Sequence, residues 1–147
     1  MAPRKPIQLN RRMFVGAGAA GLCLGSTARA APEVRMDKLY HEDDGILPLA
    51  HELDGQRIEI TGFMAPPLRA GVRFFVLAEQ PMSVCPFCDE TANWPGGIVP
   101  VYTNRSFRVA PFWKRIGVAG ELVVEDFVDP DTGFASPMRI AKAVIQG

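Results

Sequence analysis

The strongest constraint on the fold is a change of pattern near residue 56, after which apolar side chains recur at every second position. In the stretch 57–63, Ile58 and Ile60 alternate with polar residues, which is the pattern of a strand with one buried face. We expect Gly62 to mark a bulge or a sharp bend in this strand. The next predicted strand, 72–78, is almost continuously apolar and should therefore be central in the sheet.

Three more strands are predicted, over 98–103, 117–125 and 138–145, although the spacing of the last also fits a helix. Pro100 favours an edge or bulged position for the first of them. Residues 129–133, between the last two strands, have the composition of a turn. Five strands with short connections predict a mainly β fold, a small closed or partly open barrel of the oligonucleotide/oligosaccharide-binding (OB) type. A β-sandwich is the second possibility.

The first 30 residues have the organisation of a cleaved secretory signal. A basic start is followed by an apolar, glycine-rich run over 14–24, and Ala28 and Ala30 are the small residues that a signal peptidase reads. The run is about a dozen residues, whereas a spanning helix needs about 20. We therefore expect no stable membrane insertion after cleavage.

Arg11 and Arg12 stand two residues before Phe14 at the edge of the apolar run, as in twin-arginine export signals. The alternative is an ordinary secretory leader that happens to contain paired arginines. We expect the twin-arginine translocase to be a partner during export and the mature protein to be periplasmic. Because this route carries folded chains, it favours proteins that acquire a metal or cofactor before export.

The mature chain of 117 residues is long enough for one domain. We divide it into an irregular lead-in over 31–54, with helical turns over 47–53, and a barrel domain over 55–147. Five of the 16 basic residues leave with the leader, whereas all 16 acidic residues remain, so the net charge falls to −5. This charge disfavours nucleic acid or an anionic membrane as a partner and favours a cation.

The chemistry of the mature chain is concentrated in Cys85 and Cys88, because the third cysteine, Cys23, belongs to the leader. Two cysteines separated by two residues can share a metal ion, exchange between dithiol and disulfide, or form a static disulfide. All three uses remain open at this stage. A disulfide across so short a loop constrains the unfolded chain by only about 2 kcal/mol.

The sequence Cys-Pro-Phe-Cys resembles the active-site motif of glutaredoxins, but the context differs. Those proteins continue into a long helix after the motif, and here Pro95 ends any helix within about two turns. The adjacent Asp89 and Glu90 also disfavour a thiolate by charge repulsion. A strongly activated thiol is therefore not expected.

A metal site would need ligands beyond the two thiolates, since closed zinc sites have four. His41 and His51 are the two histidines of the chain, and Asp89 is a further candidate. Met82 would instead complete a soft donor set that suits Cu(I) better than zinc. The ordinary alternatives are a solvated loop histidine and a packing methionine.

Several short segments resemble an uncharacterised family of small exported bacterial proteins, known only as a domain of unknown function. These are LDGQRI (53–58), GFM (62–64), FVL (75–77), CPFC (85–88) and VAGEL (118–122). The resemblance extends from about residue 47 to residue 144 and implies export and these domain boundaries, without an activity. We expect a binding or accessory module of a larger envelope protein complex rather than an enzyme, with zinc or Cu(I) as its possible cofactor.

Overall fold

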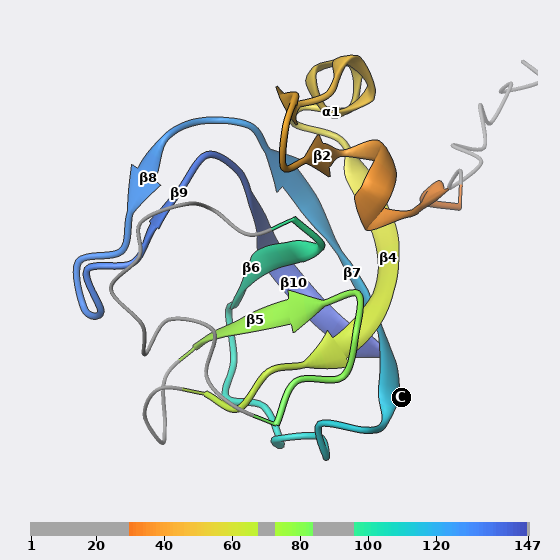
Figure 1. Ribbon diagram of the computed structural model, residues 1–147. Coiled ribbons are helices and arrows are strands. Elements are labelled where there is room, and N and C mark those ends of the chain that lie inside the picture. The colour runs from red at the N-terminus through yellow and green to blue at the C-terminus, as the bar shows by residue number, and fades with distance from the viewer. Residues whose placement is uncertain (1–29, 68–72, 84–95, 147) are drawn as a thin grey trace, which may run out of the picture.

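The computed structural model describes residues 30–67, 73–83 and 96–146 (Figure 1). In chain order its elements are β1 (Glu33–Val34), the 3-10 helix η1 (Met36–Lys38), β2 (Tyr40–His41), β3 (Gly45–Ile46), α1 (Pro48–Glu52), β4 (Arg57–Met64), β5 (Phe74–Ala78), β6 (Ile98–Thr103), β7 (Arg115–Val123), β8 (Phe127–Val128), β9 (Ala135–Ser136) and β10 (Arg139–Gln146). The five predicted strands all exist, within two residues of their expected ends. The last one is a strand rather than a helix.

Five strands close into a barrel in the order β4-β5-β6-β10-β7, because β7 also pairs with β4. The pairing of β6 with β10 is parallel, and every other pairing between barrel strands is antiparallel. This confirms the predicted small β-barrel and excludes a sandwich of two sheets. Figure 1 shows the long strands β4 and β7 running beside each other on the right of the barrel, with β5, β6 and β10 completing it.

Apolar side chains at alternate positions of the strands fill the barrel interior. Ile58 and Ile60 on β4 are completely buried, and their polar neighbours face outward. On β5 every residue is buried, because Phe75 and Leu77 enter the main core whereas the intervening residues join a second apolar cluster outside the barrel wall. This two-sided burial explains why the β5 sequence is continuously apolar.

Gly62 permits a close approach between strands rather than a bulge. The register between β4 and β7 is continuous through Phe63, where β4 also begins to pair with β5. A Cβ atom on Gly62 would lie 2.6 Å from the carbonyl oxygen of Ala78. Glycine is therefore required where β4 passes from one neighbour to the other.

The expectation of an edge or bulged position for Pro100 holds only locally, because β6 as a whole lies between β5 and β10. Pro100 is opposite Val76 of β5, and the register with β10 begins one residue later at Val101. Proline is tolerated because β6 has only one strand neighbour at that position.

The lead-in of residues 31–54 packs onto the barrel. Its first strand, β1, pairs in parallel with β4, and β2 and β3 form a small hairpin. Leu39 and Ala50 are fully buried in the same core as the barrel strands. Helix α1 spans five residues, and no helix in the described part of the chain is long and apolar enough to cross a membrane.

Candidate functional site

The predicted site residues Cys85, Cys88 and Asp89 lie outside the described residues, as do Arg11, Arg12 and Ala28 of the leader; Ala30 is described and exposed. Met82 is described and is half-buried against the second apolar cluster. Its side chain therefore has the packing role that was the ordinary alternative to a ligand.

The two histidines lie on different elements of the lead-in. His41, at the end of β2, accepts a hydrogen bond at Nδ1 from the backbone N–H of Asp43, at 3.3 Å. The carboxylates of Asp43 and Asp44 lie 3.9 and 3.8 Å from the same nitrogen. His51 is exposed on α1. Within residues 30–67, 73–83 and 96–146, no three His, Cys, Asp or Glu side chains are grouped to hold a metal ion.

Acidic side chains lie where the chain returns to the barrel ahead of β6. A Cβ atom on Gly96 would lie 3.6 Å from Cβ of Glu42, which follows His41 in the β2–β3 turn. The backbone N–H of Glu79 donates to the carbonyl oxygen of Gly97 at 2.7 Å. We call Glu42 and Glu79, together with the neighbouring His41, the acidic rim. Sequence alone did not place the β2–β3 turn beside the start of β6.

The outer face of β5 and β6 is covered by the β8–β9 hairpin, and we call it the covered face. Phe74 of β5 contacts the rings of Tyr102 and Phe134 at centroid distances of 5.0 and 5.4 Å. Tyr102 also meets Phe127 edge to face at 5.5 Å. In OB-type barrels the second and third strands form the surface that binds oligonucleotides or oligosaccharides. Here part of that surface is occupied by the protein's own hairpin.

The turn at the tip of this hairpin is held by Asp129. One oxygen of its carboxylate accepts hydrogen bonds from the backbone N–H groups of Asp131 and Thr132 and from the Thr132 hydroxyl, at 3.1, 2.8 and 2.7 Å. Gly133 adopts a φ of 72°, which suits glycine at the end of such a turn. The turn predicted over 129–133 is thus confirmed.

These contacts shift the pKa values of two side chains in the hairpin region. Burial by itself raises the pKa of Asp129, but the hydrogen bonds from Thr132 and then Asp131 outweigh it, and the pKa lies below its usual range. Burial is also the main cause that raises the pKa of Tyr102, and the nearby Asp129 carboxylate adds to it. The lowered pKa of Asp129 favours the closed hairpin at neutral pH, where this carboxylate is charged, whereas Tyr102 stays neutral there.

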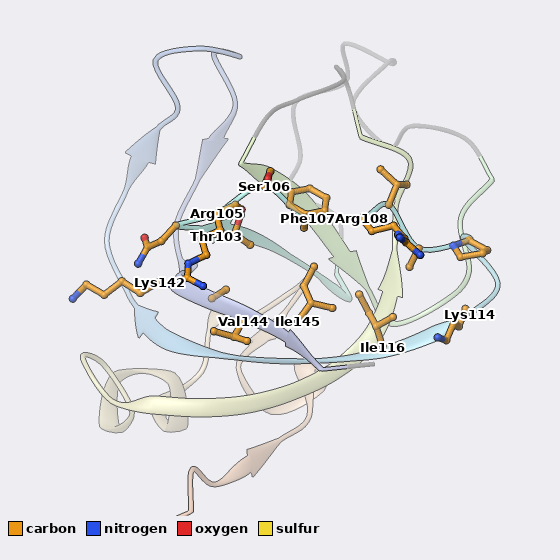
Figure 2. Close-up of a pocket in the computed structure, with 15 residues that line it drawn as sticks. Thr103, Arg105, Ser106, Phe107, Arg108, Lys114, Ile116, Lys142, Val144 and Ile145 are labelled. Carbon is orange, nitrogen blue, oxygen red and sulfur yellow. The ribbon is translucent and has the colours of Figure 1, made fainter.

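A groove of about 790 Å³ opens on another side of the barrel. It is bounded by the connection that leaves β6, residues 104–114, and by the end of β10 (Figure 2). Phe107 lies on one side of it, and Ile116, Val144 and Ile145 lie on the other. The sequence reasoning missed this groove. The available signal was the absence of any Asp or Glu between residues 91 and 120.

The closed order of the five described barrel strands, with one parallel pairing among them, defines the class: an OB-like β-barrel. A solved structure similar to this chain is that of a DUF3299 family protein from Pseudomonas aeruginosa PAO1. The TM-score is 0.52 and the identity 17%, over 80% of this chain and 95% of that one. At this identity the similarity shows the fold alone. No protein-family model and no curated protein matches the sequence.

Proposed function

We propose that the protein is an exported periplasmic accessory module that binds a soft metal ion through Cys85 and Cys88. We further propose that it belongs to a domain-of-unknown-function family of exported bacterial proteins. The twin-arginine signal supports export, and the segments that resemble such a family support the membership. The barrel fold shared with a DUF3299 protein agrees with the proposed membership.

The observation that carries the metal proposal is the position of Glu42, whose Cβ would lie 3.6 Å from a Cβ atom on Gly96. Gly96 follows the cysteine-bearing connection, and Glu42 is adjacent to His41 in the sequence. The carboxylate residues Glu42 and Glu79 therefore lie where that connection rejoins the barrel. Negative charge at this rim attracts a cation and disfavours a free thiolate, which supports metal binding over nucleophilic thiol chemistry.

The described donors favour zinc over Cu(I) in this proposal. Met82, the soft third donor that copper would require, packs in an apolar cluster. His41 is half-exposed and its Nε2 atom is available to a metal, whereas Nδ1 accepts the Asp43 N–H. We therefore assign Cys85, Cys88 and His41 as the preferred ligands, with Asp89 as the fourth and His51 as the alternative imidazole.

Intact-mass measurement of the purified protein tests the proposal, first under native and then under denaturing conditions. We expect a zinc adduct that is lost on denaturation and is absent from Cys85→Ser. His41→Ala should weaken zinc binding by about tenfold or more, whereas His51→Ala should leave it unchanged. A loss in His51→Ala instead would assign the imidazole ligand to His51.

Two other results would contradict metal binding and assign the cysteine pair another use. A mass short by two hydrogens that thioredoxin restores would make the pair an exchanging redox centre. An oxidised pair that resists mild reductant would make it a static disulfide in a plain interaction domain.

A further inference from the structure

The groove begins where two barrel strands separate. The parallel pairing of β6 and β10 ends at Thr103 and Ala143. Beyond it β10 continues to Gln146 and pairs only with β7, on its other side. Among the described residues, no strand occupies the remaining edge of 144–146. The groove therefore runs alongside an open strand edge, which can accept another extended chain.

Unpaired positive charge lines the same groove. Arg105, Arg108 and Lys114 are exposed, and in the described part of the chain none of them forms an ion pair with a carboxylate. Lys142 differs, because its Nζ atom lies 2.7 Å from Glu121. Three cations thus remain without a counter-charge in a mature chain whose net charge is negative.

The walls of the groove between these cations are apolar. Val109 and Val144 are 53% and 56% exposed, and Phe107, Ala110 and Ile145 are half-buried against the main core. A volume of about 790 Å³ lies within the range of about 300–1,000 Å³ that is usual for ligand pockets. The site therefore combines apolar walls, a positively charged rim and a free backbone edge.

We propose that this groove binds an extended segment of another protein in which acidic and aliphatic side chains alternate. Such a segment would add a strand to β10. Successive side chains of a strand point in opposite directions, so one set would meet Val144 and Phe107 while the carboxylates of the other set meet Arg105 and Arg108. Neither the cysteines nor a metal takes part, so this site is independent of the function proposed above.

The open edge distinguishes a peptide from the other anionic partners. A nucleic acid or an anionic lipid surface would use the cations but not the backbone groups of 144–146. Trp113, which is 67% exposed and lies edge to face with Phe112, would suit a lipid surface. The experiment therefore includes vesicles as a competing partner.

The test measures fluorescence anisotropy of a labelled peptide of about eight residues, in which Glu alternates with Leu or Val. The same peptide with Gln or with Lys in place of Glu is the control. We expect the Glu peptide to bind the purified protein at least about tenfold more tightly than either control. Methylation of alternate backbone amide nitrogens of the Glu peptide should lower its affinity by a similar factor, because strand addition needs those donors.

Charge reversal of the groove is the matched test on the protein. Arg105→Glu/Arg108→Glu changes two exposed residues and should leave folding intact. It should lower the affinity for the Glu peptide by about tenfold or more. Lys38→Glu changes an exposed cation outside the groove and should alter the affinity less than about twofold. Circular dichroism confirms that each variant is folded.

Three results would overturn the proposal. Equal affinity for the Glu and Gln peptides would exclude charge recognition, and equal affinity for the methylated peptide would exclude strand addition. Sedimentation with vesicles of phosphatidylglycerol, lost in Arg105→Glu/Arg108→Glu and without peptide binding, would assign the groove to a membrane surface instead.

Discussion

The covered face and the groove are two apolar regions on the same barrel, and they differ in what lies over them. On the covered face the β8–β9 hairpin packs against β5 and β6, and Phe74 is only 5% exposed. In the groove no described element occupies the edge of β10, and Val144 is 56% exposed. The first region is completed by the chain itself, whereas the second presents apolar surface to solvent.

The charges show the same contrast. Beside the covered face, Arg139 stacks over the ring of Phe127 at 4.3 Å and donates to Glu125. In the groove, Arg105 and Arg108 have no described counter-charge. A guanidinium that is paired with a carboxylate of the same chain belongs to the folded structure, whereas unpaired cations beside apolar walls are more typical of a binding surface. The predictions below test this division.

The largest effect is expected on the covered face. Phe74→Ala removes a buried ring from contact with Tyr102 and Phe134 and should lower the free energy of unfolding by about 3–4 kcal/mol. Trp113→Ala, at an exposed aromatic residue near the groove, should lower it by less than about 0.5 kcal/mol. Urea unfolding measures both, and equal losses would contradict the comparison.

A smaller effect is expected at the turn that holds the hairpin. Asp129→Ala removes the acceptor of three hydrogen bonds and should cost about 1–2 kcal/mol. Hydrogen exchange should then increase in β8 and β9 more than in β4 and β7, because the hairpin opens locally. A uniform increase over the barrel would show that the hairpin and the barrel unfold together.

The same carboxylate makes stability depend on pH. Because the pKa of Asp129 is lowered in the folded protein, its contribution is present above the ordinary Asp pKa of about 3.9 and is lost as the pH falls through the lower, folded value. Asp129→Asn keeps an acceptor oxygen but does not titrate, so it should unfold with a weaker acid dependence. Asp131→Asn is the exposed control.

The smallest effect on stability is expected at the edge of the groove. Glu121→Gln breaks an exposed ion pair with Lys142 and should change the free energy of unfolding by less than about 0.5 kcal/mol. It also releases a fourth cation, so the Glu peptide should bind about two- to threefold more tightly. Glu125→Gln, which frees Arg139 instead, should leave the affinity unchanged. Tighter binding in both variants would show that net charge matters rather than the groove.

The strands and turns of the barrel could be predicted because each produces a pattern among residues that are close in the sequence. The alternation of Ile58 and Ile60 and the turn residues around Asp129 each depend on neighbours within a few positions. The place of Pro100 in the sheet was harder to predict. Whether its missing N–H matters depends on where β10 starts to pair, which is about forty residues further along the chain.

The candidate sites were less predictable. The cysteine pair is a sequence motif, and its use stays a prediction because those residues lie outside the described part of the chain. The groove escaped notice because net charge averages over the whole chain and hides a local cluster such as Arg105, Arg108 and Lys114. His41 and Glu42 could be named from sequence, but the position of Glu42 beside Gly96 required the fold.

The sequence by itself determined the strands and the turns between them, because residues close along the chain favour or forbid each local conformation. The leader stays a prediction. Tertiary structure decided the closure of β7 onto β4, the covering of β5 and β6 by the hairpin, and the gap after Thr103 where β10 has no second neighbour. Each of these depends on pairing between distant residues. Such pairing is selected by the packing of the whole core, and no single segment encodes it.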